Sequence, residues 1–326
     1  MAKQRIPVVV VAGFLGSGKT TLLNHLLATA GGTRIGVLVN DFGSINVDAM
    51  TVASQVDSTI SLSNGCLCCA VDPSDMDDML TRLAKPSANV DVIVIEASGL
   101  AEPQSMVKLV LASSQPRITY GGLVLVVDAA EFTATSARHP EIAKHLRLAD
   151  LVVLNKTDRA ADLPTVRAAV PSGTPVVETT LGRVDPALLF DPRPRTPTIG
   201  QLSFEDLVED HGDHVHALYD SVEFTGSTPL HPRRFLRFLS ARPTGLYRVK
   251  GFVDFGTDDR YALHTVGDHL SLERTPWPRG VPRATQLVMI GTGLSEHELT
   301  TGLSACATTE PAGPGALLDV TRYLRP

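Results

Sequence analysis

Three cysteines crowd into the stretch SNGCLCC, at Cys66, Cys68 and Cys69, in a chain whose only other cysteine is Cys306. Thiolates are soft ligands, which Zn²⁺ and other late transition metals favour. Gly65 gives the backbone freedom for a tight turn that brings the three sulfurs toward one ion. Three thiolates are one short of a closed tetrahedral shell, and an incomplete shell suits a protein that passes its metal on. Metal binding is therefore the favoured interpretation of the cluster.

Other readings of the cluster stay open. Small buried residues near the start of a helix would need no ligand. A redox pair involving Cys66 or Cys68 is a further alternative, although the cluster lacks the C-x-x-C spacing of thioredoxin-like sites. A disulfide framework is disfavoured, because neighbouring cysteines do not easily satisfy the geometry of a bridge.

A second stretch, GFLGSGKT, fits the phosphate-loop pattern G-x-x-x-x-G-K-[ST] and lies between a strand-like and a helix-like run. In such a loop the backbone N–H groups face the phosphates, and the helix that follows adds the positive end of its dipole. Lys19 is expected to contact the β- and γ-phosphates, and the Thr20 hydroxyl to contact Mg²⁺. The nucleotide-binding residues predicted here are Gly13, Gly16, Ser17, Gly18, Lys19, Thr20 and Thr21.

A carboxylate near the magnesium ion is expected at the end of another strand. VDVIVIEASG supplies Glu96 after an apolar run, and Gly99 follows with a backbone N–H suited to sensing the γ-phosphate. Asp128, in VLVVDA, is the competing candidate. We favour Glu96, and assign the catalytic roles to Lys19 and Glu96.

The base is predicted from NKTD at residues 155–158, directly after the apolar run LVVL. A carboxylate at Asp158 can accept hydrogen bonds from the ring N–H and the amine of guanine, which adenine does not present there. Asn155 can bond another edge of the base, and the stem of Lys156 can lie along the ring. After a phosphate loop, this pattern favours GTP.

The elements that must position these residues alternate along the first part of the chain. Short Val- and Ile-rich runs, apolar on both faces, are separated by stretches with helical spacing, which predicts a doubly wound α/β fold with a mostly parallel sheet. Later strands and two helices predict a smaller α+β domain, with a loose surface segment at TTEPAGPGA. We expect a phosphate-loop domain over residues 1–192, a linker with a short helix and a His-containing segment over 193–216, and the α+β domain over 217–326.

Composition excludes several classes of protein. The net charge of −6 argues against a nucleic-acid binder, which should carry a basic stripe. No run approaches the ~20 apolar residues that span a bilayer, and no signal peptide is evident, so we expect a cytoplasmic protein that binds no membrane. In HGDHVH, His211, His214 and His216 suit either weak metal coordination or a solvated linker. Cys306 is expected in the core of a folded domain. Three further histidines are also expected in the folded domains and not as ligands: His231, His264 and His269.

The segments GFLGSGKTTLLNHLL, NDFG, SNGCLCC, EASGLAEP and VLNKTD, in this order, resemble the CobW-type GTPases, which are metallochaperone-like proteins. The resemblance covers essentially the whole chain, because that family also carries a C-terminal α+β domain. It places Asp41 where the family usually has glutamate, where it would serve Mg²⁺ or the transported metal. Ser44 departs from the acidic residue common there.

The resemblance implies a GTPase that uses Mg²⁺, carries Zn²⁺ or Co²⁺ on the three cysteines and delivers it to a client metalloprotein. The cluster lies between NDFG and Glu96, where the two switch segments are expected, so a metal there can respond to the γ-phosphate. The alternative is a GTP-responsive metal store or sensor without significant turnover. The sequence does not identify the metal or the client, and it is compatible with a homo-oligomer.

Overall fold

The computed structural model describes residues 5–39, 59–61, 73–97, 102–191, 219–241, 243–278, 280–309 and 314–324. The chain separates into two compact units, with the second built mainly from Tyr219–Pro326. The expected linker over residues 193–216 lies outside the described residues, as do Asp41, Gly99, the three clustered cysteines and the histidines of HGDHVH.

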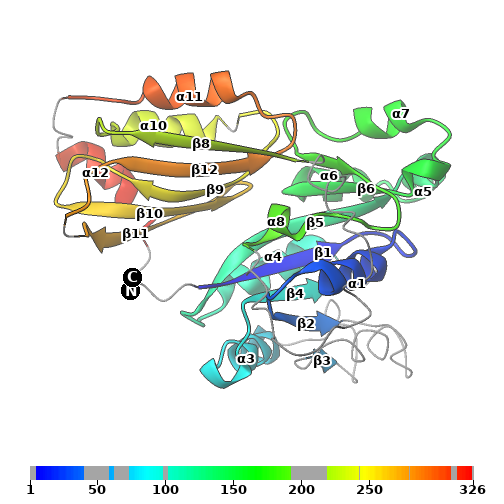
Figure 1. The fold of residues 1–326 in the computed structure, drawn as a ribbon. Helices are drawn as coiled ribbons and strands as arrows, with labels where there is room; N and C mark the ends of the chain where they lie inside the picture. The colour runs from blue at the N-terminus through cyan, green and yellow to red at the C-terminus, as the bar shows by residue number, and fades with distance from the viewer. Residues whose placement is uncertain are drawn as a thin grey trace, which may run out of the picture. The chain divides into compact units, whose positions relative to one another are not determined.

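The first unit is built on a parallel sheet of seven strands in the order β3-β2-β4-β1-β5-β6-β7 (Figure 1). Val- and Ile-rich strands occupy its centre and are buried along their length, as strands covered on both faces should be. The strands are β1 (Ile6–Ala12), β2 (Ile35–Val39), β3 (Thr59–Ser61), β4 (Val92–Glu96), β5 (Ile118–Asp128), β6 (Leu151–Asn155) and β7 (Val176–Glu178).

Helices cover both faces of this sheet. Val8 and Val10 pack in one core with Met106 of α4, whereas Val9 and Val11 point to the other face, where α1 lies (Figure 1). The helices are α1 (Lys19–Thr29), α3 (Pro73–Leu83), α4 (Pro103–Ala112), α5 (Phe132–Arg138), α6 (Ile142–Leu148), α7 (Leu163–Ala168) and α8 (Pro186–Leu189). The predicted doubly wound α/β fold is confirmed.

β5 is irregular where it pairs with β1, the strand that leads into the phosphate loop. The pairing of β1 with β5 shifts register between Val8 and Val10, opposite the two glycines of YGGL. A buried carboxylate, Asp150, accepts hydrogen bonds there from the Tyr120 hydroxyl at 2.6 Å and from the Leu123 N–H at 2.9 Å. These bonds satisfy polar groups at the register shift, which would otherwise cost free energy in the core.

The second unit is an antiparallel sheet of five strands in the order β11-β10-β9-β12-β8. Three helices contribute to its core, which includes Phe235, Leu299 and Val320. Its elements are β8 (Asp220–Gly226), α10 (Pro232–Ser240), β9 (Leu246–Val253), β10 (Asp259–Val266), β11 (His269–Pro276), β12 (Thr285–Gly291), α11 (Glu296–Ser304) and α12 (Pro314–Thr321). The predicted α+β class is confirmed here.

Five short elements among the described residues were not predicted from the sequence: β3, α5, α7, α8 and α12. The strand β3 and the helix α5 are too short to show a clear periodicity. The helix α12 begins at Pro314, inside the segment expected to be loose, so that expectation was wrong for its last residues. Proline is favoured at the first position of a helix, because its missing N–H has no helical partner there.

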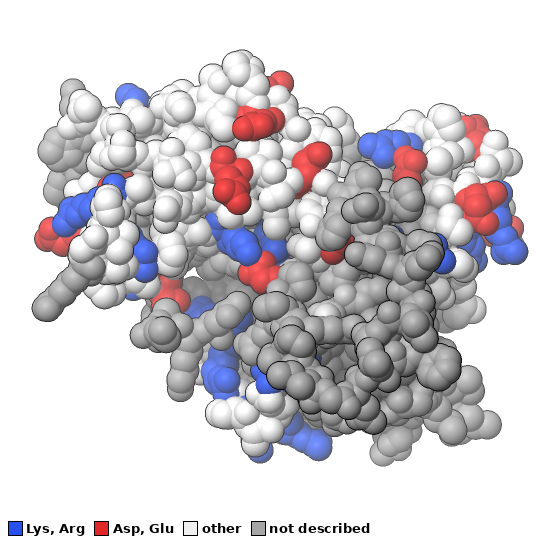
Figure 2. Space-filling model, viewed as in Figure 1, with Lys and Arg blue, Asp and Glu red and all other residues white. Residues whose placement is uncertain are grey.

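Charged side chains of both signs are interspersed on the face of the molecule drawn in Figure 2. No single basic stripe crosses the described part of that face, in line with the net charge of −6. In the described part of the chain, no helix is long and apolar enough to span a membrane.

Replacing Tyr120 by phenylalanine tests the role of the buried Asp150. Tyr120→Phe keeps the ring but removes the donor, so we expect the free energy of unfolding to fall by about 1–3 kcal/mol. Urea denaturation followed by circular dichroism measures the change. Thr29→Ala, which removes an exposed hydroxyl, serves as the control and should change stability by less than about 0.5 kcal/mol. Equal effects of the two substitutions would contradict this account.

Candidate nucleotide-binding site

The phosphate loop connects β1 to α1, and two of its glycines are required by close contacts. Gly13 has φ of +150°, and a Cβ there would lie 2.2 Å from the carbonyl oxygen of Val126 on β5. Gly18 has φ of +103°, and a Cβ there would lie 2.2 Å from Nδ2 of Asn155 on β6. Both positions therefore exclude larger residues, and the loop is packed against the ends of two neighbouring strands.

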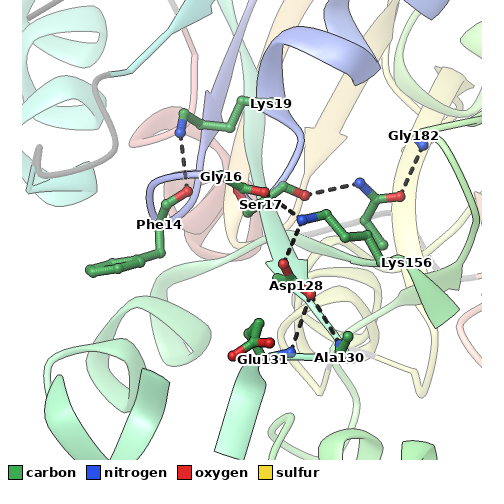
Figure 3. Close-up of polar contacts among 10 residues, drawn as sticks. Phe14, Gly16, Ser17, Lys19, Asp128, Ala130, Glu131, Lys156 and Gly182 are labelled. Carbon is green, nitrogen blue, oxygen red and sulfur yellow. Dashed lines mark hydrogen bonds and ion pairs between the residues drawn. The ribbon is translucent and has the colours of Figure 1, made fainter. Parts of the chain in front are cut away.

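The start of α1 is suited to hold an anion. Gly18 is its N-cap, no side chain in the described residues caps it, and its first turn carries no acidic residue. The N–H groups of the first turn and the helix dipole therefore face the loop without competition from a carboxylate of the helix itself. Lys19 is buried, and its ammonium donates to the carbonyl oxygen of Phe14 at 3.2 Å, across the loop (Figure 3). Ser17 is buried in the loop, while Thr21 is exposed on the first turn.

The predicted magnesium ligands lie next to each other. The Thr20 hydroxyl donates to Oε1 of Glu96 at 2.8 Å, and Glu96 is buried at the carboxyl end of β4. β4 pairs with β1, so the strand that carries Glu96 runs beside the strand that leads into the phosphate loop. A hydroxyl and a carboxylate are the hard oxygen donors that Mg²⁺ takes, so the residues present fit this ion.

Asn155 of the NKTD segment joins two loops. Its Nδ2 donates to the carbonyl oxygen of Ser17 at 2.9 Å, and its Oδ1 accepts from the N–H of Gly182 at 2.9 Å. The side chain is buried and both ends of its amide are engaged by backbone groups. The structure therefore gives Asn155 a role in loop positioning, and the contact with the base that the sequence suggested stays a prediction.

Lys156 has a left-handed backbone with φ of +60°, and begins the short turn Thr157–Arg159. Its ammonium donates to the Gly16 carbonyl oxygen at 2.8 Å and lies 2.6 Å from Oδ2 of Asp128 (Figure 3). The Asp158 side chain, in the turn, is exposed and available to a ligand. Asp128, the competing candidate for the magnesium site, is thus paired with Lys156, while Glu96 contacts Thr20.

The sequence analysis missed the loop that follows β7. Leu181 in this loop has φ of +58° and is 61% exposed. A left-handed backbone is uncommon for leucine, and its apolar side chain is more stable when buried. The next residue, Gly182, donates to Asn155 and packs so closely on α1 that a Cβ would lie 2.8 Å from the Leu22 nitrogen. The signal in the sequence was a glycine just after a buried strand, which is common in turns of every kind.

A hollow of about 340 Å³ lies beside residues 13–16 of the phosphate loop. Phe14, Leu15, Phe132 and Ile142 supply apolar side chains to its lining. His145 also lines it, and burial lowers the pKa of that imidazole, which favours its neutral form. The hollow is therefore lined both by the phosphate loop and by the carboxyl end of β5.

The three cysteines predicted to hold a transition metal lie outside the described residues. Among those residues, no three His, Cys, Asp or Glu side chains are grouped so that they could hold a metal ion. β3 ends at Ser61, and its parallel pairing with β2 brings that residue to the carboxyl edge of the sheet, from which the sequence runs on to Cys66. Cys306 is buried in the second unit, and burial raises the pKa of its thiol, so it is a core residue as expected.

The chain matches two consecutive family descriptions: "CobW/HypB/UreG, nucleotide-binding domain" over residues 7–172 and "Cobalamin synthesis protein cobW C-terminal domain" over residues 219–307. The chain belongs to the CobW/HypB/UreG family. A relative from Sinorhizobium sp, named Zinc chaperone CobW, is 32% identical over 88% of this chain and 93% of its own length.

Two further relatives carry related names. Zinc chaperone YjiA of Escherichia coli K12 is 28% identical over 90% of this chain and 96% of its own length. A crystal structure described as Zn(II)-bound YjiA GTPase covers 94% of this chain and 100% of its own, with 22% identity and a TM-score of 0.45. Zinc-regulated GTPase metalloprotein activator 1 of Dictyostelium discoideum is 39% identical over 31% of this chain and 23% of its own length.

Substitutions of Lys19 and Glu96 should separate nucleotide binding from turnover. Lys19→Ala removes the buried ammonium, and we expect GTP affinity to fall by about 10- to 100-fold. Glu96→Gln keeps the size of the side chain and removes its charge, so GTP should still bind while turnover slows by about 100-fold. Fluorescent-nucleotide titration and phosphate release measure the two quantities. Normal turnover by Glu96→Gln would remove Glu96 from the magnesium site.

Proposed function

We propose that this protein is a GTP-hydrolysing metal chaperone, which carries a transition-metal ion on Cys66, Cys68 and Cys69 and releases it to a client protein. The observation that carries the proposal is the short contact between Thr20 and Glu96 at the mouth of the phosphate loop. It joins the two predicted magnesium ligands at the edge of the sheet where β3 ends, shortly before the cysteines. Family membership and the names of the relatives support the same function.

Recognition of GTP would be divided among three parts of the sheet edge. The N–H groups of the phosphate loop and the Lys19 ammonium would bind the phosphate oxygens, and Thr20 and Glu96 would hold the magnesium ion. Such an ion neutralises charge on the phosphates when bound. The exposed carboxylate of Asp158 would accept hydrogen bonds from guanine, while Asn155 keeps the base loop and phosphate loop together.

Hydrolysis would depend on charge neutralisation and on the position of the attacking water. Lys19 would counter the negative charge that builds on the phosphate oxygens as the bond to the γ-phosphate breaks. The sequence offers no obvious glutamine to orient the water, so we expect slow intrinsic turnover. A client that docks on the GTP-bound protein would complete the site.

The cargo would be bound by thiolates in a reducing compartment, which is why we assign the protein to the cytoplasm. Zn²⁺ and Co²⁺ both suit a site of three sulfurs. An open coordination position lets a ligand from the client attack the ion before the chaperone's cysteines leave, so the metal is transferred without free release. The client would be a metalloprotein, and we propose no role in nucleic-acid or membrane binding.

Asp158→Asn tests the guanine assignment. The amide can no longer accept both N–H groups of guanine, so affinity for GTP should fall by about 100-fold. The same amide can donate to the extra carbonyl of xanthine, so affinity for xanthosine triphosphate should rise. Titrating both proteins with GTP, XTP and ATP measures the change. Equal affinity of the wild-type protein for GTP and ATP would refute the assignment.

A Co²⁺ titration tests the coupling between metal and nucleotide. Thiolate-to-Co²⁺ charge-transfer absorbance should appear in the wild-type protein and vanish when Cys66, Cys68 and Cys69 are replaced by serine. Co²⁺ affinity should differ between a non-hydrolysable GTP analogue and GDP by about 5- to 150-fold, the usual size of an allosteric coupling. Cys306→Ser is the matched control and should leave the absorbance unchanged. Identical affinities in the two nucleotide states would favour a metal store over a chaperone.

A further inference from the structure

The carboxylate of Asp128 has two separate tasks at the end of β5. Its Oδ1 accepts hydrogen bonds from the backbone N–H groups of Ala130 at 3.0 Å and Glu131 at 3.2 Å. Its Oδ2 faces the Lys156 ammonium at 2.6 Å (Figure 3). The first oxygen fixes the turn after β5, and the turn fixes where the second oxygen lies. Asp128 is therefore a rigid negative charge at the carboxyl edge of the sheet.

The ammonium of Lys156 is held between this charge and the phosphate loop. Its backbone φ of +60° is disfavoured for any residue with a side chain. Its ammonium reaches Asp128 on one side and the Gly16 carbonyl oxygen of the phosphate loop on the other. A long, flexible side chain is thereby kept extended across the site, at the start of the turn that carries Asp158.

We propose that Asp128 is a positioning residue for guanine recognition, acting through Lys156. The inference rests on the proposed use of GTP and deepens it. By fixing the ammonium, Asp128 aligns the stem of Lys156 for contact with the face of the base and holds the Thr157–Arg159 turn in register, so that Asp158 meets the edge of the base. Without the carboxylate, ordering the four-carbon stem would cost conformational entropy each time a nucleotide binds.

The size of the effect follows from the setting of the pair. The side chains of Asp128 and Lys156 are 16% and 30% exposed, so the pair is partly shielded from water. Loss of one charge-assisted hydrogen bond in such a setting corresponds to about a 10-fold change in affinity. In this proposal the pair acts on the base and not on the γ-phosphate. The affinity of the protein for GTP and its affinity for GDP should therefore fall by the same factor. KM for GTP should rise about 10-fold while kcat stays unchanged.

Asp128→Asn separates the two tasks of the carboxylate. The amide oxygen can still accept from Ala130 and Glu131, which preserves the turn, while the amide nitrogen cannot accept from Lys156. Glu131→Gln is the matched control, because it removes the same charge from an exposed carboxylate three residues along the chain. It should leave the affinity for both nucleotides unchanged. Asp128→Ser, which also keeps a turn-capping oxygen, replaces Asp128→Asn if the latter does not fold.

A double-mutant cycle decides whether Asp128 acts through Lys156. Lys156→Met keeps the apolar stem and removes the ammonium, so adding Asp128→Asn to it should cause no further loss of GTP or GDP affinity. Additive losses, or unchanged affinity in Asp128→Asn, would overturn the inference. A fall in kcat with unchanged KM would overturn it as well. If the wild-type protein bound no GTP, the proposed function itself would fail, which is a distinct result from an unaffected variant.

Discussion

The buried amide of Asn155 is the contact on which the geometry of the nucleotide site depends. One end holds the phosphate loop through Ser17, and the other holds the loop after β7 through Gly182. Each loop alone could adopt other conformations, because glycines supply its turns. The amide also restricts the sequence around it, since any side chain at Gly18 would collide with its nitrogen. One residue thus ties the part of the site predicted for the phosphates to the part predicted for the base.

The parallel sheet explains why these residues meet at all. In such a sheet the strands end at one common edge, so loops far apart in the sequence become neighbours. Glu96 ends β4, Asp128 ends β5 and Asn155 ends β6, and all three side chains lie close to the phosphate loop or to each other. The register shift in β5, where Asp150 accepts two hydrogen bonds, lies on the same strand as Val126. The carbonyl oxygen of Val126 approaches Gly13 of the phosphate loop closely.

Residue patterns predicted every strand of the described residues except β3, and most of the helices, because these elements show a local periodicity. They also predicted that Thr20 and Glu96 would be neighbours, because the ends of parallel strands share one edge of the sheet. Patterns did not predict that Asn155 would bond two backbone groups or that Asp128 would pair with Lys156. Both contacts join residues of different loops, and a sequence shows only that a suitable donor and acceptor exist. Leu181 was missed for a similar reason, since its exposure depends on a left-handed turn that leucine does not suggest. The roles assigned to the cysteines, to Asp41 and to Gly99 remain predictions.

The hydrogen bond between Thr20 and Glu96 bears on how quickly a cation can be captured. Two adjacent ligands of an octahedral Mg²⁺ shell, each about 2.1 Å from the ion, lie about 3.0 Å apart. The Thr20 hydroxyl oxygen and Oε1 of Glu96 are 2.8 Å apart, which is close to this spacing. Little more than rotation of one O–H bond is then needed to present both lone pairs, and side-chain rotations of this kind take picoseconds to nanoseconds. The slow event in assembling these two ligands is thus the dehydration of the ion itself, a rate set by the metal and not by the protein.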